Sequence, residues 1–308
     1  MTAEKQKEPS WDVLFPRAVS FDQPGYNYTS MGVGGKIDRI MRPSSVREMG
    51  KMVCLLHAHD IPYVVVGNWT NLVVTDKGFR GALIWTRNLD RIQVEEDKNG
   101  AWKITAEAGV LLGELVGITM RENMTGLEFC SGIPGTVGGG VRMNAGAYGR
   151  SISASIVSVE IMDEEGKTKI WEREDLHFAY RHLHLPAGHV ITGATFHVSP
   201  DDQGQVGDKV REIMEDRKAK HPLDYKNAGS IFKNPHGHAP AGRLIEEAGL
   251  KGYAVGDAAV SEKHGNFIIN RGGASAADVL TLIEHVKETI FLRYGVLLET
   301  EIKVIGEQ

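Results

Sequence analysis

Three polar side chains that lie far apart in the sequence, Arg181, Ser230 and Glu301, occur where they could do chemistry. Arg181 follows aromatic residues in HFAYRHLHLP, and its forked guanidinium could neutralise a carboxylate or a developing oxyanion. Ser230 lies in the turn-forming stretch NAGSIFKNP, and Glu301 lies in LLETEIKVIG, where a half-buried carboxyl group could act as an acid. A structural arginine, a turn serine bonded to its own backbone and a solvated glutamate explain the same patterns. No G-x-S-x-G elbow surrounds Ser230, which disfavours an acyl-serine hydrolase.

The segment 131–149, SGIPGTVGGGVRMNAGAYG, holds seven glycines in nineteen positions and is called the glycine segment below. Glycine costs roughly 0.5–1 kcal/mol relative to alanine inside a helix or strand, so no ordinary helix or strand is expected here. Clustered backbone N–H groups form a concave anion site, which predicts a large phosphate-bearing ligand. A dinucleotide fingerprint begins at Gly32 but fails at Ile37, so a nucleotide site is expected without a Rossmann fold.

The composition is that of a globular protein of two or three domains, with 308 residues, 42% of them hydrophobic, and a net charge of -5. Acidic and basic residues are interleaved, which argues against nucleic-acid binding. No apolar run reaches the roughly 18–20 residues of a membrane span. The N-terminal residues lack the apolar core of a secretory signal, so a cytoplasmic protein is expected.

Cysteines and histidines give no metal motif. Cys54 and Cys130 are too few for a disulfide framework and are expected to be buried free thiols, with a redox role for Cys130 as the alternative. The twelve histidines form neither H-E-x-x-H nor a set with a cysteine pair, so solvated loop and strand histidines are expected and no metal is predicted.

Hydrophobic periodicity predicts a mixed α and β protein, because helical and strand patterns alternate along the chain. A helix with a serine cap is expected from Ser44, and a buried strand follows at 63–67. The closing segment VLLETEIKVIG is expected to be a strand that packs Leu297, Ile302 and Val304. Further helices are expected at 111–123, 206–219, 241–250 and 274–295, with a Ser275 cap and a Gly295 stop on the last, and further strands at 81–85, 101–109, 155–166 (opening a hairpin) and 189–200.

Several blocks taken together resemble one family, the UDP-N-acetylenolpyruvoylglucosamine reductases. The resemblance runs from about residue 20 to 306, and the order of the blocks makes it specific. The blocks are TSMGVGG (29–35), the glycine segment, YR (180–181), AGSIFKNP (228–235), AGRLIEEAGLKG (241–252), VSEKHGNFIIN (260–270) and LLETEIKVIG (297–306).

This resemblance implies an α+β fold with a two-subdomain FAD-binding module of the vanillyl-alcohol-oxidase type and a C-terminal α+β substrate domain. It implies a lead-in over 1–20, FAD-binding subdomains at 21–90 and 91–215, and a substrate-binding domain at 216–308. The implied activity is the NADPH-dependent reduction of UDP-N-acetylglucosamine enolpyruvate to UDP-N-acetylmuramate through FAD. That reaction belongs to cytoplasmic peptidoglycan precursor synthesis, with a UDP-sugar and NADPH as the small-molecule partners.

The resemblance also implies roles for individual residues. Arg181 matches the family's active-site arginine, Ser230 its proton donor and Glu301 its active-site glutamate. The short interval between Arg181 and Ser230 resembles the family type that lacks an inserted lid. Substrate contacts are implied for Tyr180, Lys233 and Asn234. FAD contacts are implied for Gly67, Asn68, Thr70, Asn71, Ser131, Gly132, Ile133, Pro134, Gly135, Gly138, Gly139, Asn144, Gly146 and Ala147.

The chain departs from the family pattern at three positions. Trp69 stands where the family's G-x-G-S-N stretch has its second glycine, which implies either a reshaped loop with the indole at its edge or a lower affinity for FAD. Ala179 replaces a glycine, and Leu183 replaces a serine two residues after Arg181. The alternatives are another FAD oxidoreductase of the same fold and a catalytically idle nucleotide-binding paralogue.

Overall fold

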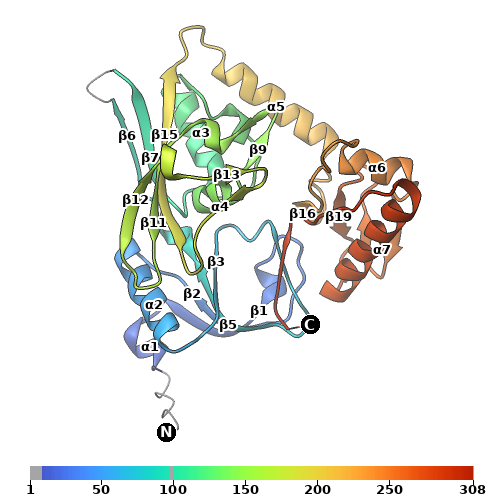
Figure 1. Ribbon diagram of the computed structural model, residues 1–308, viewed down its shortest axis with the longest axis horizontal. Coiled ribbons are helices and arrows are strands. Elements are labelled where there is room, and N and C mark those ends of the chain that lie inside the picture. The colour runs from blue at the N-terminus through green and yellow to red at the C-terminus, as the bar shows by residue number, and fades with distance from the viewer. Residues whose placement is uncertain (1–8, 97–99, 308) are drawn as a thin grey trace. The chain divides into compact units, whose positions relative to one another are not determined.

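The computed structural model describes residues 9–96 and 100–307. These residues form two compact units (Figure 1). The first unit comprises the chain up to Gln23, Asp38–Asn68 and Gly81–Val210, and the second comprises Pro24–Ile37, Trp69–Arg80 and the residues from Arg211 onward. The chain passes between the units five times, once in the loop at Asn68 and Trp69 and four times within elements: β1 (Val19–Pro24), β2 (Lys36–Met41), β5 (Phe79–Trp85) and α5 (Val206–Lys220). Of the predicted lead-in, residues 1–8 lie outside the described residues, and α1 (Trp11–Leu14) follows them.

The larger sheet of the first unit has the order β12-β11-β15-β7-β6, with β8 also paired to β15. The predicted hairpin is confirmed, because β11 and β12 pair antiparallel from Ser158↔Glu172 to Met162↔Thr168. Figure 1 shows α3 and α4 beside this sheet, and their apolar side chains join it in one buried cluster. The bounds are β6 (Ile92–Glu96), β7 (Trp102–Glu107), α3 (Leu112–Arg121), β8 (Met124–Thr125), α4 (Val137–Arg142), β11 (Ile156–Met162), β12 (Thr168–Glu172) and β15 (Val190–Pro200).

A second sheet has the order β1-β2-β5-β3, and α2 (Val46–Ala58) packs its Met49, Met52 and Leu56 into a core with Ile84 of β5. The predicted serine cap is confirmed at Ser45, whose side chain accepts a hydrogen bond from the Glu48 N–H. Strand β3 (Tyr63–Val66) is parallel to β5 and ends directly before Gly67. The run YVVV suits a strand, but β3 lies at the edge of the sheet and only Val66 is buried, so the predicted strand is confirmed and its full burial is not.

The second unit contains a sheet of order β16-β19-β18-β17, with α6 and α7 in the same hydrophobic core. Helix α7 is confirmed with both predicted ends: the Ser275 side chain accepts from the Asp278 N–H, and Gly295 has φ +68°. The bounds are β16 (Lys226–Ser230), α6 (Ala241–Glu247), β17 (Ala254–Val255), β18 (Ala258–Val260), β19 (Phe267–Asn270) and α7 (Ala276–Tyr294). Strand β20 (Lys303–Ile305) pairs parallel with β4 (Leu72–Val74) of the same unit.

Two sequence expectations about local structure are wrong. A short helix, α4, does run through the glycine segment, because a Cβ at Gly138 would lie 2.9 Å from the Ala108 Cβ and glycine permits that close packing. The closing strand is confined to β20, and Leu297 and Val304 are 77% and 39% exposed instead of packed. Val296, Leu298 and Ile302 are the buried residues there, because pairing of residues 299–301 with 231–233 sets a different alternation.

The expectations for cysteines and histidines need correction too. Both thiols are free, but Cys54 is exposed and only Cys130 is buried. Burial, followed by the charge of Glu128, raises the pKa of the Cys130 thiol to about 12, which disfavours the thiolate that redox chemistry needs. His221 and His264 are only partly exposed: they pack on each other and on Phe267, and burial lowers the pKa of both imidazoles.

Candidate functional site

The glycine segment lies against the loop that follows β3. The Asn68 side-chain amide donates to the Pro134 carbonyl at 2.9 Å. A Cβ at Gly67 would lie 2.1 Å from the Thr136 Oγ1, so only glycine allows this approach without a shift. Thr136 is itself fixed, because it is buried and its side chain accepts from the Gly139 N–H as the cap of α4. The sequence thus brings two predicted cofactor loops together within the first unit.

Most backbone N–H groups from Ser131 to Gly140 donate within the protein. Those of Val137 and Gly138, for example, donate to the carbonyls of Val110 and Ala108. The N–H groups of Gly132, Gly135 and Thr136 meet no acceptor among residues 9–96 and 100–307. Three donors without acceptors within five residues fit the oxygens of a diphosphate group.

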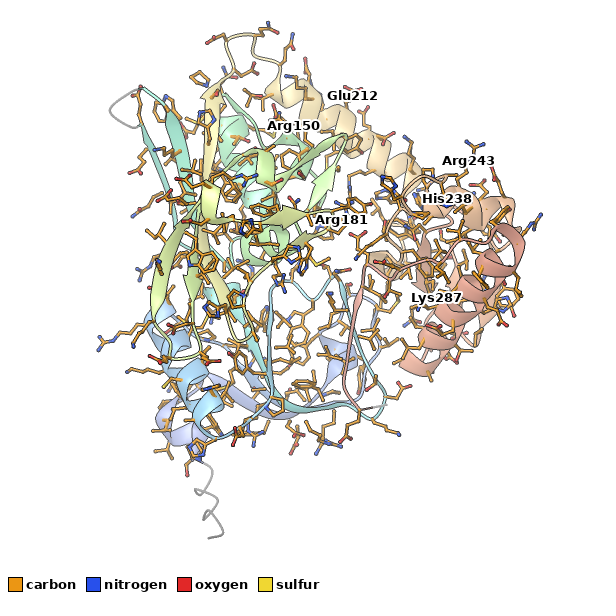
Figure 2. The ribbon with its side chains drawn as sticks, viewed as in Figure 1. Arg150, Arg181, Glu212, His238, Arg243 and Lys287 are labelled. Atoms are coloured by element: carbon orange, nitrogen blue, oxygen red, sulfur yellow. The ribbon has the colours of Figure 1, made fainter. Side chains whose placement is uncertain are left out.

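Arg181 lies in the turn of a hairpin made by β13 (Phe178–Ala179) and β14 (His182–Leu183). Its φ of +56° is left-handed, a conformation that is uncommon for a non-glycine residue. The Arg181 Nη1 donates to the Gly146 carbonyl at 2.8 Å, and its guanidinium lies 5.3 Å from the ring centre of the exposed Tyr180. Figure 2 labels Arg181 at this hairpin, beside α4. The predicted arginine is therefore attached to the glycine segment.

In the second unit, the chain near Ser230 pairs with the chain near Glu301. The Glu301 N–H donates to the Ile231 carbonyl at 2.7 Å, and the Lys233 N–H donates to the Glu299 carbonyl at 2.9 Å. Ser230 is the last residue of β16 rather than a turn residue, directly after Gly229 with φ +75°. Two of the predicted catalytic residues are thus carried by neighbouring backbone segments.

Asn266 stabilises this arrangement, although its only signal in the sequence is its place in the family block 260–270. Its Oδ1 accepts from the Phe232 N–H at 2.9 Å, and its Nδ2 donates to the Phe232 carbonyl at 2.8 Å. Its own carbonyl accepts from the Ile231 N–H. Because Asn266 is buried, these bonds replace water for backbone groups that would otherwise be unsatisfied. Asn266 therefore fixes the segment that follows Ser230.

The remaining predicted residues of the second unit have structural partners. The Asn71 side-chain amide donates to the Glu301 carbonyl at 3.1 Å. Lys233 pairs with Glu299 at 3.0 Å between Nζ and Oε2, and the Asn234 Oδ1 accepts from the Ala241 N–H at the start of α6. Asn71 thus contacts the backbone of Glu301.

Trp69 keeps the backbone conformation that favours glycine. Its φ is +56°, and the side chain is 4% exposed, with its ring centre 5.3 Å from that of Tyr28. The expectation of an indole at the edge of the loop is wrong, because the side chain packs inside the second unit. Leu183 is likewise fully buried, in the core of the first unit.

Comparison with known proteins first gives the class. Residues 37–170 match the FAD binding domain family, and residues 221–305 match the C-terminal domain of UDP-N-acetylenolpyruvoylglucosamine reductase. This combination, in a fold of mixed helices and strands, defines an FAD-dependent oxidoreductase.

Whole-chain relatives then give the family. The chain is 46% identical to UDP-N-acetylenolpyruvoylglucosamine reductase from Syntrophus aciditrophicus, over 94% of this chain and 93% of that protein. It is 43% identical to the protein of that name from Clostridium tetani, over 91% and 90% of the two chains. The crystal structure of the Thermus caldophilus reductase superimposes with a TM-score of 0.77 at 35% identity, covering 92% of this chain and 97% of that one. The chain belongs to the UDP-N-acetylenolpyruvoylglucosamine reductase family.

Within the part of the chain that the structure describes, the helices are too short or too polar to cross a membrane. No set of three histidine, cysteine, aspartate or glutamate side chains in these residues is grouped as metal ligands.

Proposed function

We propose that this protein reduces UDP-N-acetylglucosamine enolpyruvate to UDP-N-acetylmuramate with NADPH, in the cytoplasm, as a step of peptidoglycan precursor synthesis. Family membership over nearly the whole chain supports the reaction class. The observation that carries the assignment of residues is the bond from the Glu301 N–H to the Ile231 carbonyl, because it holds the Ser230 and Glu301 segments together.

The FAD site we propose consists of the loop at Gly67 and Asn68 and the N–H donors of Gly132, Gly135 and Thr136. These groups suit the diphosphate, since they are backbone donors beside a glycine that permits close approach. FAD bound by these residues would supply the redox chemistry, which is hydride transfer from NADPH to the enolpyruvyl group. The chain's own residues then have to manage charge and one proton.

The charge that develops on the substrate is an enolate at its carboxylate. Arg181 stabilises that charge through its guanidinium, and a protonated Glu301 donates a hydrogen bond to it. Ser230 gives a proton to the carbon next to the carboxylate, and solvent replaces that proton. The balance is one hydride and one proton added across the double bond, with NADPH oxidised to NADP. We assign Tyr180, Lys233 and Asn234 to substrate binding.

Steady-state NADPH oxidation by the purified flavoprotein tests this proposal. We expect oxidation that depends on the enolpyruvyl sugar and yields UDP-N-acetylmuramate, while UDP-N-acetylglucosamine, which lacks the double bond, supports none. A yellow protein that oxidises NADPH without regard to the enolpyruvyl sugar would instead be another flavin oxidoreductase. A protein that stays colourless after addition of FAD would be an idle paralogue.

A further inference from the structure

The hairpin that carries Arg181 is too small to hold its own position. Its two strands have two residues each and pair only at Phe178↔Leu183 and Ala179↔His182. An isolated two-stranded hairpin is marginally stable at best, and a left-handed residue in its turn adds strain. Other contacts must therefore fix the place of Arg181.

Three alternate residues of the glycine segment, Arg142, Asn144 and Gly146, supply such contacts. Each one bonds a different part of the hairpin. Arg142, the last residue of α4, donates from Nη1 to the Leu183 carbonyl on β14, and the same atom lies 3.3 Å from the His182 Nδ1. Asn144 donates from Nδ2 to the Ala179 carbonyl on β13 at 2.9 Å. Gly146 accepts from the Arg181 side chain.

The Arg142 residue is exposed, but its guanidinium is partly removed from water where it bonds the hairpin. This partial burial lowers the pKa of the guanidinium. Among the described residues it forms no ion pair with a carboxylate. A cation partly removed from water needs compensating bonds, and here a backbone carbonyl of the hairpin provides one.

Both polar ends of the Asn144 side-chain amide also form hydrogen bonds with backbone groups. Besides donating to Ala179, its Oδ1 accepts from the Ser153 N–H at 3.1 Å. Both polar ends of this side chain thus bind protein, although the family resemblance assigns Asn144 to the cofactor. These contacts indicate that Asn144 fixes the backbone at Ala179 and Ser153.

We propose that Arg142, together with Asn144, is a positioning residue for Arg181, holding the hairpin 178–183 on the glycine segment so that the Arg181 guanidinium meets the substrate carboxylate. The inference rests on the proposed function for the role of Arg181. Leu183 fits this scheme, because its side chain anchors β14 in the core while its carbonyl receives Arg142.

The first test measures the hairpin itself, without turnover. Hydrogen exchange of the amides at 178–184 in the FAD-loaded protein is compared between wild type and Arg142→Met, with Arg121→Gln as the control. Arg121 is matched because it is an exposed arginine that ends α3 in the same unit. We expect faster exchange in the hairpin of Arg142→Met alone, and equal exchange in all three proteins would overturn the proposal.

The second test uses the two half-reactions. Arg142→Met should slow oxidation of the reduced enzyme by the enolpyruvyl sugar by about 10–100-fold, since a misplacement near 1 Å costs about that much, and should leave reduction by NADPH unchanged. Arg142→Lys keeps the charge and a donor, so it should recover part of the rate. Should Arg142→Met fail to fold, Arg142→Gln, which removes the charge and shortens the side chain, takes its place, and wild-type rates with normal hairpin exchange in that variant would refute positioning.

A double-mutant comparison separates positioning from a general structural effect. In an Arg181→Ala background, Arg142→Met should cause no further loss of the sugar-dependent rate, because the residue it positions is gone. Fully additive losses would overturn the proposal. If the wild type itself gives no sugar-dependent oxidation, the proposed function fails, and the exchange measurement still decides whether Arg142 holds the hairpin.

Discussion

The two units hold their proposed catalytic side chains by different means. In the first unit, Arg181 lies on a small hairpin that side chains of Arg142 and Asn144 attach to the glycine segment. In the second, Ser230 and Glu301 lie on backbone segments that hydrogen-bond directly to each other. The position of Arg181 thus depends on hydrogen bonds from side chains, whereas the positions of Ser230 and Glu301 depend on hydrogen bonds between backbone groups.

Mutations in the two units should therefore have different effects. Backbone pairing in the second unit is part of the core that includes Ile231 and Phe232, so disturbing it should reduce both stability and activity. The Arg142 bond to the hairpin of the first unit comes from an exposed residue, so removing it should reduce activity more than stability. The following predictions test that separation.

The largest effect is expected from Ser230→Ala. Removal of the proton donor should slow oxidation of the reduced enzyme by the enolpyruvyl sugar by about 10²–10⁴-fold, because general acid catalysis contributes that much. Reduction by NADPH and the melting temperature should stay unchanged. Stopped-flow absorbance measures both half-reactions, and an unchanged sugar-dependent rate would show that Ser230 is not the proton donor.

A large loss of stability is expected from Asn266→Ala. The change leaves the buried N–H and carbonyl of Phe232 without their partner, at about 1–3 kcal/mol for each group. Chemical denaturation should show a fall in the free energy of unfolding of that order. Asn88→Ala, at an exposed position, is the control. Equal stability of the two variants would contradict the view that Asn266 fixes the Ser230 segment.

An intermediate effect is expected from Gly67→Ala. The added methyl group would meet the Thr136 Oγ1 at 2.1 Å, and such overpacking costs about 1–3 kcal/mol. FAD affinity should fall as the two loops separate, which a titration of flavin fluorescence measures. Gly113→Ala on the exposed face of α3, where nothing lies within 4 Å, should bind FAD normally and raise stability by about 0.5–1 kcal/mol. Normal FAD binding by Gly67→Ala would argue against the proposed cradle.

The smallest effect concerns pH. Burial, then the charges of Arg217 and His264, lower the pKa of His221 to about 4 from an ordinary value of 6.5. A pKa that is lower in the folded protein means that the unfolded chain binds protons first, so stability is full above about pH 6.5 and falls as the pH drops toward 4. His221→Gln should flatten this decline in thermal unfolding curves, and the exposed His236→Gln should not. Identical pH profiles for the two variants would refute the assignment.

Sequence patterns predicted the elements whose signals are local. Helix α7 has its Ser275 cap and Gly295 stop, and β3 is a β-branched run between turn signals, so short-range energetics determine both. The family resemblance of the blocks predicted the FAD-binding class for the same reason, because each block is a continuous stretch of sequence.

The features that escaped prediction depend on contacts between distant residues. Helix α4 forms despite its glycines, since Gly138 and Gly140 pack closely on Ala108 and Ile152. No local sequence pattern predicts that Arg142 donates to the Leu183 carbonyl, or that Asn266 hydrogen-bonds both the N–H and the carbonyl of Phe232. From sequence alone, an arginine on a short helix is expected to have a solvated side chain. Only the fold shows that it donates to a backbone carbonyl.

An anaerobic half-reaction tests the proposed reaction most directly. The FAD-loaded protein is reduced with NADPH until the absorbance of oxidised flavin is lost, and UDP-N-acetylglucosamine enolpyruvate is then added without oxygen. We expect the absorbance to return in full as one UDP-N-acetylmuramate forms for each FAD. Absorbance that stays bleached with the enolpyruvyl sugar, and returns only when air is admitted, would contradict it.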